Sequence, residues 1–335
     1  MINSIIELGN KIEDLWSKVG HDETAFPDIC YEELADFNNE MSLDDFDSEM
    51  ADWIQKSSLP TQLNVYNSFG QPPVTVFNNG KFVIDLYFWM HVDTSIHSHS
   101  FCGAFKVFFG RSLHEQFSIQ PIDIYAPDIM KTKVDRIKTD ILDQGSTLRI
   151  IQGNDFTHRV IHLETPTITL CARTVSDTTK QQWHHFPNGI SIEKKSIPED
   201  VLKKIYFYQY LLQRDEEKGL EFLKDLVQDL SLSINMNLYE QLTMDPMGLE
   251  DYAIEPFFNE VYARVGETPW FKEYMGHYQK LQETELDFEA YTPELRFLEH
   301  AIINEYTEDE TLKYMEKICG DKVSGELLET IKRHF

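Results

Sequence analysis

The central part of the chain constrains the fold most. Between residues 61 and 195, short segments rich in β-branched and aromatic residues alternate with Gly, Pro and Asp clusters. The segments 74–77 and 82–89 flank Asn79-Gly80, a dipeptide typical of a tight hairpin turn. Many short strands with no helical pattern among them predict an antiparallel barrel or sandwich. Further strands are expected over 104–109, 113–119, 147–152, 158–163 and 167–174, and a long polar connection over 120–146.

Both ends of the chain have the apolar periodicity of helices. In residues 1–60, helices are expected around Ile5–Val19, after Pro27 and after Ser42, which is a suitable N-cap. A later helix is expected over 200–213, with its start at Ser196 or Pro198, and others are expected from near Asp215, Gly248, Thr268, Pro293, Thr307 and Ser324. We therefore predict an α+β chain with three parts. An N-terminal helical segment (1–60) and a C-terminal helical domain (196–335) flank an antiparallel β-barrel of jelly-roll type (61–195).

The net charge of −27 comes from the two flanks. Residues 1–60 hold 15 acidic and 3 basic side chains, and residues 196–335 hold 30 and 14. The centre is almost neutral, with 12 acidic and 13 basic side chains. Nucleic acids and anionic lipid surfaces attract clustered Lys and Arg, so neither a nucleic-acid nor a membrane partner is expected. The acidic flanks are otherwise explained by solubility.

The cysteine pattern indicates a reducing compartment. Four cysteines lie far apart and form no paired motif, which favours free thiols in the cytoplasm. No run of about 18 uncharged apolar residues is present, so no membrane span is expected. The N-terminus lacks the basic and apolar regions of a signal peptide. We expect a cytoplasmic protein.

Three histidines are placed to share one metal ion. His97 and His99 are one residue apart on a predicted strand, so their side chains point to the same face. His158, from a distant strand, would add a third imidazole and leave coordination positions open. Three neutral imidazoles leave a divalent metal its full positive charge, which favours anionic ligands such as a thiolate, an enolate or a carboxylate. Iron(II) would bind substrate and dioxygen side by side, whereas zinc would activate water.

These residues resemble the cupin motifs. The segment 96–110 is similar to the first motif, with His-x-His and a glycine that ends the strand, and Gly153–His158 is similar to the second. The resemblance covers roughly residues 75–176. Gly103 and Ala104 occupy the positions of the usual glutamate ligand. A cupin site with three histidines and no glutamate looks most like the thiol dioxygenase branch, whose best known member is cysteine dioxygenase. The resemblance implies an RmlC-like barrel and favours iron(II), with zinc, nickel or manganese as alternatives.

Departures from that branch argue against cysteine as the substrate. The positions of the family's Ser-His-Tyr relay correspond to Thr169, Cys171 and Arg173. No arginine stands near Val74 or Thr75, where the arginine that binds the cysteine carboxylate is expected. Arg173 is interpreted either as a replacement anion clamp or as an outward surface residue. The family's crosslinking cysteine aligns with Gly103, and Cys102 is its neighbour.

Other side chains near the histidines are candidates for the pocket. His162 lies four residues past His158 and faces the same way on a regular strand, so it is a candidate acid or base near neutral pH. Either His114 or Glu115 must face inward, and His91 is expected at the rim. The predicted pocket residues are Cys102, Gly103, His114, Thr169 and Cys171.

We therefore predict an iron(II) dioxygenase-like oxidoreductase that acts on a small anionic or thiol-bearing molecule. A non-oxidative metal cupin, such as an isomerase or hydrolase, is one alternative. Another is a ligand-binding sensor or scaffold whose helical flanks bind a partner protein. The flanks could equally cap the barrel mouth or form a homodimer.

Overall fold

The computed structural model describes most of the chain as two compact units. The described residues are 1–38, 40–63, 70, 73–90, 94–175, 180–195, 197–244, 247–283, 292–304, 306–320 and 323–334. The first unit comprises Met1–Ser118, Arg136–Lys180 and Thr284–Phe335, and the second Ile119–Asp135 and Gln181–Glu283. The division at residues 60 and 195 stays a prediction.

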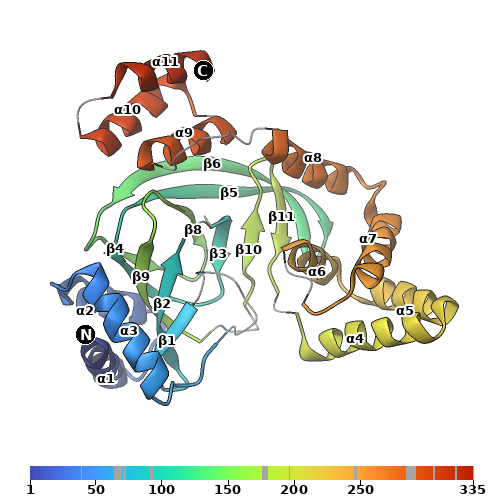
Figure 1. The fold of residues 1–335 in the computed structure, drawn as a ribbon, viewed down its shortest axis with the longest axis horizontal. Helices are drawn as coiled ribbons and strands as arrows, with labels where there is room; N and C mark the ends of the chain where they lie inside the picture. Colours follow the sequence, from blue (N-terminus) through green and yellow to red (C-terminus); the bar gives the residue numbers. More distant parts are fainter. Residues whose placement is uncertain are drawn as a thin grey trace. The chain divides into compact units, whose positions relative to one another are not determined.

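The three N-terminal helices pack on a five-stranded antiparallel sheet in the first unit (Figure 1). They are α1 (Ile2–Lys18), α2 (Phe26–Asp36) and α3 (Leu43–Lys56). The predicted N-cap is confirmed, because the Ser42 side chain accepts a hydrogen bond from the Asp45 backbone N–H. Buried Phe26 and Phe46 share one core cluster with Phe82 and Phe108 of the sheet. The sheet order is β1 (Pro73–Asn78), β2 (Phe82–Trp89), β9 (Thr167–Thr174), β4 (Gly103–Phe109) and β7 (Thr147–Ile150).

The predicted β1–β2 hairpin is confirmed. The two strands pair antiparallel from Asn78↔Val83 to Pro73↔Tyr87. Gly80, in the connection, has a φ of +84°, a conformation that glycine adopts without a steric penalty. The Asn-Gly dipeptide was therefore a correct turn signal.

The other strands close into an antiparallel barrel, which confirms the predicted α+β class. Their order is β10 (Trp183–His185), β11 (Ile190–Glu193), β6 (Ile129–Leu142), β5 (Ser112–Ala126), β8 (Gly153–His162) and β3 (Ile96–His99). The prediction of a long polar connection over 120–146 was wrong, because most of it belongs to β5 and β6. Ile122 and Ile124 are 65% and 71% exposed. Because this hairpin is exposed, it has the polar composition of a loop. Its sequence therefore lacks the apolar pattern that predicts a strand packed on a core.

The two faces of β5 and β8 have different partners. Leu113 and Ile161 pack in one apolar cluster with Phe297 and Met315 of the C-terminal helices. These helices are α9 (Pro293–Ile303), α10 (Glu308–Cys319) and α11 (Gly325–His334). Because strand side chains alternate, the even-numbered residues of β5 and β8 face the other way, into the barrel.

The second unit contains most of the remaining helices. They are α4 (Glu199–Arg214), α5 (Glu216–Asp229), α6 (Leu232–Met244), α7 (Asp251–Val265) and α8 (Pro269–Glu283). The sequence did not predict α6, because its buried side chains include Ser233, Asn235 and Asn237, which break the apolar periodicity. Ser196, one predicted helix start, lies outside the described residues. No helix of the described part is long and apolar enough to cross a membrane.

Candidate metal centre

The structure brings His97, His99 and His158 together. One ligand atom from each ring lies within 4.8 Å of the others. His97 and His99 alternate with Ser98 on β3, and His158 on β8 is the cross-strand partner of His97. All three side chains are buried. The predicted convergence of two neighbouring histidines and one distant histidine is therefore present.

The ring nitrogens of these histidines fit a divalent metal. His97 Nδ1 lies 2.8 Å from the Ser95 carbonyl oxygen, so Nδ1 donates a hydrogen and Nε2 becomes the ring nitrogen that would bind a metal. Among the residues that the structure describes, His99 Nδ1 and His158 Nε2 are buried and have no hydrogen-bond partner. Unsatisfied buried nitrogens are costly, and a bound metal would remove this cost at both.

His114 orients the ring of His158 through a hydrogen bond on the side away from the histidine cluster. Its Nε2 lies 3.1 Å from His158 Nδ1, and it faces the barrel interior, which settles the choice between His114 and Glu115. If His158 Nε2 binds a metal, Nδ1 must carry the hydrogen and donate it to His114 Nε2. His114 is then the Nδ1–H tautomer. Its Nδ1 has no hydrogen-bond partner in the described part of the chain.

Burial keeps the cluster uncharged. It lowers the pKa of His97, and it lowers those of His99 and His158 well below their ordinary values, with a further contribution from the neighbouring His97. The same cause lowers the pKa of His114 to about 4. Metal binding requires neutral imidazole, so the four rings are in the correct protonation state at pH 7.

Arg173 lies inside the fold, so the alternative of a surface residue is wrong. Its side chain is 3% exposed, and its Nη2 lies 2.9 Å from Asp85 Oδ2. Arg173 Nε also lies 3.2 Å from the Tyr87 hydroxyl. Its guanidinium stands 5.0 Å over the ring of Phe101, which in turn lies 4.9 Å from the ring of His99. The charge is therefore paired within the protein, and the role of an anion clamp stays a prediction.

Three further predicted residues are buried, Thr169 and Cys171 on β9 of the five-stranded sheet and His162 on β8 of the barrel. Thr169 Oγ1 accepts a hydrogen bond of 2.9 Å from Trp89 Nε1. Cys171 packs with aromatic side chains, and burial raises the pKa of its thiol to about 12. His162 stacks on Trp89 at 4.3 Å, and its Nδ1 lies 3.1 Å from Ser112 Oγ. Burial lowers the pKa of His162 well below its ordinary value, so the ring is neutral. Its acid–base role stays a prediction.

Two predicted pocket residues have other surroundings. Cys102 Sγ lies 3.4 Å from the Glu23 carbonyl oxygen, in the core cluster beneath the N-terminal helices. Gly103 lies where β4 and β9 approach closely, and a Cβ there would collide with the Ala172 carbonyl oxygen. The structure therefore gives both residues packing roles. His91 lies outside the described residues.

A buried polar cluster that sequence reasoning missed lies behind the histidines. Glu115 is fully buried, and its Oε2 lies 2.7 Å from Arg159 Nε and 3.1 Å from His300 Nε2. Its Oε1 accepts a hydrogen bond from the Tyr306 hydroxyl. Glu115 and Arg159 directly follow His114 and His158, so the cluster joins the strands of the site to α9. From the sequence, only strand alternation could have placed Glu115 and Arg159 on the face opposite to His114 and His158, because the partners in this cluster are far away in sequence.

Comparisons with known proteins find only remote structural likenesses. No family model matches the chain, and no curated protein matches it in sequence. A hydroquinone 1,2-dioxygenase, PnpCD, is 13% identical over 32% of this chain and 69% of its own, with a TM-score of 0.24. The DMSP lyase structure (RdDddP and RnDddQII) is 14% identical over 47% and 77%, with a TM-score of 0.26. The Drosophila melanogaster CENP-C cupin domain is 9% identical over 41% and 99%, with a TM-score of 0.21.

The class of the fold follows from the chain's own architecture. An antiparallel barrel carries His-x-His on β3 and the third histidine on β8, as the sequence resemblance to cupins implies. The chain thus has an antiparallel barrel with a three-histidine cluster that fits a divalent metal, an arrangement that resembles the cupins. Because the identities and TM-scores are low, the activity has to be argued from the site.

Proposed function

We propose that the protein is a metal-dependent cupin enzyme, an iron(II) dioxygenase-like oxidoreductase that acts on a small anionic or thiol-bearing molecule. The observation that carries this proposal is the convergence of His97, His99 and His158, a group that includes no carboxylate from the described residues. Three neutral ligands leave the metal its full charge, so an anionic substrate is favoured. When bound, iron(II) would supply open positions for substrate and dioxygen.

The side chains around the cluster restrict the substrate. Tyr87, Trp89 and Phe105 of the five-stranded sheet belong to one buried apolar cluster with Phe156 of β8. His99 and His158 contact the ring of Phe156, at 6.0 and 4.6 Å between ring centroids. These surroundings favour a small molecule and exclude bulk water from the reacting atoms.

We propose that cysteine is a poor substrate. Arg173 is buried on β9, and its charge is paired with that of Asp85. Thr75, near the position expected for the family's arginine, donates a hydrogen bond of 2.7 Å to the same carboxyl group. A cysteine carboxylate would therefore have to compete with Asp85 for Arg173.

The proposed setting is cytoplasmic, with a small-molecule substrate and without nucleic-acid or membrane partners. The acidic flanks and the unpaired cysteine pattern support this proposal. A homodimer, or a partner protein bound through the helical flanks, is compatible with the same site.

Oxygen consumption tests the proposed activity. The iron(II)-loaded protein is mixed with a panel of small thiols and carboxylates in an oxygen electrode. We expect uptake with at least one of them, loss of uptake in His97→Ala, and normal uptake in His21→Ala, a partly exposed histidine outside the cluster. Turnover of the same substrate without oxygen would favour an isomerase or hydrolase, and binding without turnover would favour a sensor. Rapid sulfinate formation from cysteine would contradict its exclusion.

A further inference from the structure

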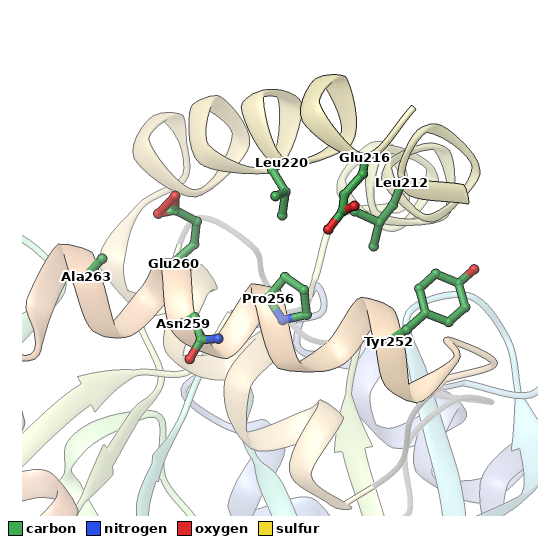
Figure 2. Close-up of a pocket in the computed structure, with 8 residues that line it drawn as sticks. All are labelled: Leu212, Glu216, Leu220, Tyr252, Pro256, Asn259, Glu260 and Ala263. Atoms are coloured by element: carbon green, nitrogen blue, oxygen red, sulfur yellow. The ribbon is translucent and has the colours of Figure 1, made fainter. Parts of the chain in front are cut away.

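We propose that the second unit has a docking groove for a basic amphipathic helix of a partner protein. The groove has a volume of 620 Å³ and lies between the α4–α5 corner and α7 (Figure 2). Its lining residues all belong to the second unit and are remote in sequence from the metal histidines. The inference therefore goes beyond the proposed oxidoreductase activity.

The groove is long and follows a helix. On α7, Tyr252, Pro256 and Ala263 are spaced by four and seven residues, so they form one stripe. The stripe extends over three turns, a length of about 16 Å. On the opposite wall, Leu212 and Leu220 are eight residues apart and face Pro256 (Figure 2). A helix with apolar residues at i, i+4 and i+11 presents side chains at the same intervals.

The walls expose apolar surface. Leu220 is 40% exposed and Tyr252 is 41% exposed. Six of the 15 exposed large hydrophobic side chains of the described residues lie on α4, α5 and α7, including Phe207, Tyr210 and Tyr262. Single exposed apolar residues are ordinary, whereas such a concentration on three neighbouring helices is typical of an interaction surface.

The negative charge of the groove favours a positively charged partner. Glu216 on one wall and Glu260 on the other point into the groove, and its lining contains no Lys or Arg (Figure 2). Among the described residues, neither carboxylate forms an ion pair. Residues 199–265 contain 14 acidic and 6 basic side chains. A basic segment is therefore favoured, whereas a second copy of this chain, with a net charge of −27, would be repelled.

The test uses a fluorescein-labelled peptide of about 16 residues, with Leu at i, i+4, i+7 and i+11 and Lys on both flanks of this stripe. Binding to the full-length protein is measured by fluorescence anisotropy. We expect saturable binding that falls about tenfold in Leu220→Asp and falls steeply on raising the salt concentration to about 0.5 M. Ile54→Asp, which changes an apolar residue of α3 in the first unit that is 42% exposed, is the matched control and should bind normally. Circular dichroism checks that each variant is folded.

A charge exchange makes the test specific. The double variant Glu216→Lys/Glu260→Lys should no longer bind the Lys-flanked peptide. It should instead bind a peptide in which each Lys is replaced by Glu. Equal binding of a peptide with the same composition and a scrambled apolar stripe would overturn the proposal. So would unchanged affinity in Leu220→Asp. Self-association abolished by Leu220→Asp in sedimentation experiments would assign the groove to a second copy instead.

Discussion

His114 Nε2 lies 3.1 Å from His158 Nδ1, on the side of the ring opposite the nitrogen that faces the histidine cluster. The two residues come from adjacent antiparallel strands, where His114 pairs with Val160 and Gln116 pairs with His158. A hydrogen bond at Nδ1 fixes both the orientation and the tautomer of a ligand imidazole. His114 is thus a positioning residue for the proposed ligand.

Replacing His114 should weaken metal binding without removing the site. In His114→Phe, His158 Nδ1 loses its acceptor, and we expect metal affinity to fall about 10- to 100-fold. His114→Gln retains an acceptor and should recover most of the affinity. Competition with a chelator, followed by the absorption of bound cobalt(II), measures both. Wild-type affinity in His114→Phe would show that the hydrogen bond does not orient the ligand.

Glu115→Gln should strongly destabilise the protein. Glu115 is buried among Arg159, His300 and Tyr306, and its loss leaves buried positive charge without a partner. We expect the free energy of unfolding in urea to fall by about 3–5 kcal/mol. The control Asp135→Asn breaks the exposed pair with Lys133 and should cost at most about 1 kcal/mol.

The effect of Glu115→Gln should depend on pH in one direction. Burial alone would raise the pKa of Glu115, but Arg159 and His300 hold it well below the ordinary 4.5. A depressed pKa adds stability above pH 4.5, and this stability is lost as the pH falls further. The difference in unfolding free energy between wild type and variant should therefore be constant near pH 7 and shrink below pH 4.5. A difference that grows in acid would contradict this assignment.

The histidine cluster could be predicted because its signals are local. His97 and His99 share a strand, and the hairpin and most helices have turn or capping residues next to them. The partners of Glu115 could not be predicted, because His300 and Tyr306 are 185 and 191 residues away. Arg173 was ambiguous for the same reason, since only the register of β2 and β9 places it beside Asp85. Local sequence patterns predict helices, strands and turns, whereas the pairing of segments far apart in sequence determines which polar residues are buried.

Arg173 and Asp85 should be energetically coupled. Each single variant, Arg173→Gln or Asp85→Asn, leaves one buried charge unpaired and should cost about 3 kcal/mol or more. The double variant should cost less than the sum of the two, by about 1–3 kcal/mol. Urea unfolding of the four proteins gives the coupling energy. Additive costs would show that the two groups act independently.

His162 should make the protein sensitive to mild acid. Burial lowers the pKa of His162 well below the ordinary 6.5, so below this pH the unfolded chain binds a proton that the folded chain does not. Stability should therefore fall as the pH falls from 7 to 5, and His162 should account for about 2 kcal/mol of the loss. His162→Phe keeps a ring against Trp89 and should reduce this loss by that amount. The same pH dependence in wild type and variant would refute the assignment.

The metal content of natively purified protein tests the central claim most directly. Elemental analysis of the wild type should find about one iron per chain, bound by His97, His99 and His158. His97→Ala and His158→Ala should both lose the metal, while His21→Ala retains it. Zinc or nickel in the same site would keep the metal centre and contradict the assignment to oxygen chemistry. No metal in any of the four proteins, even after reconstitution, would contradict the metal centre itself.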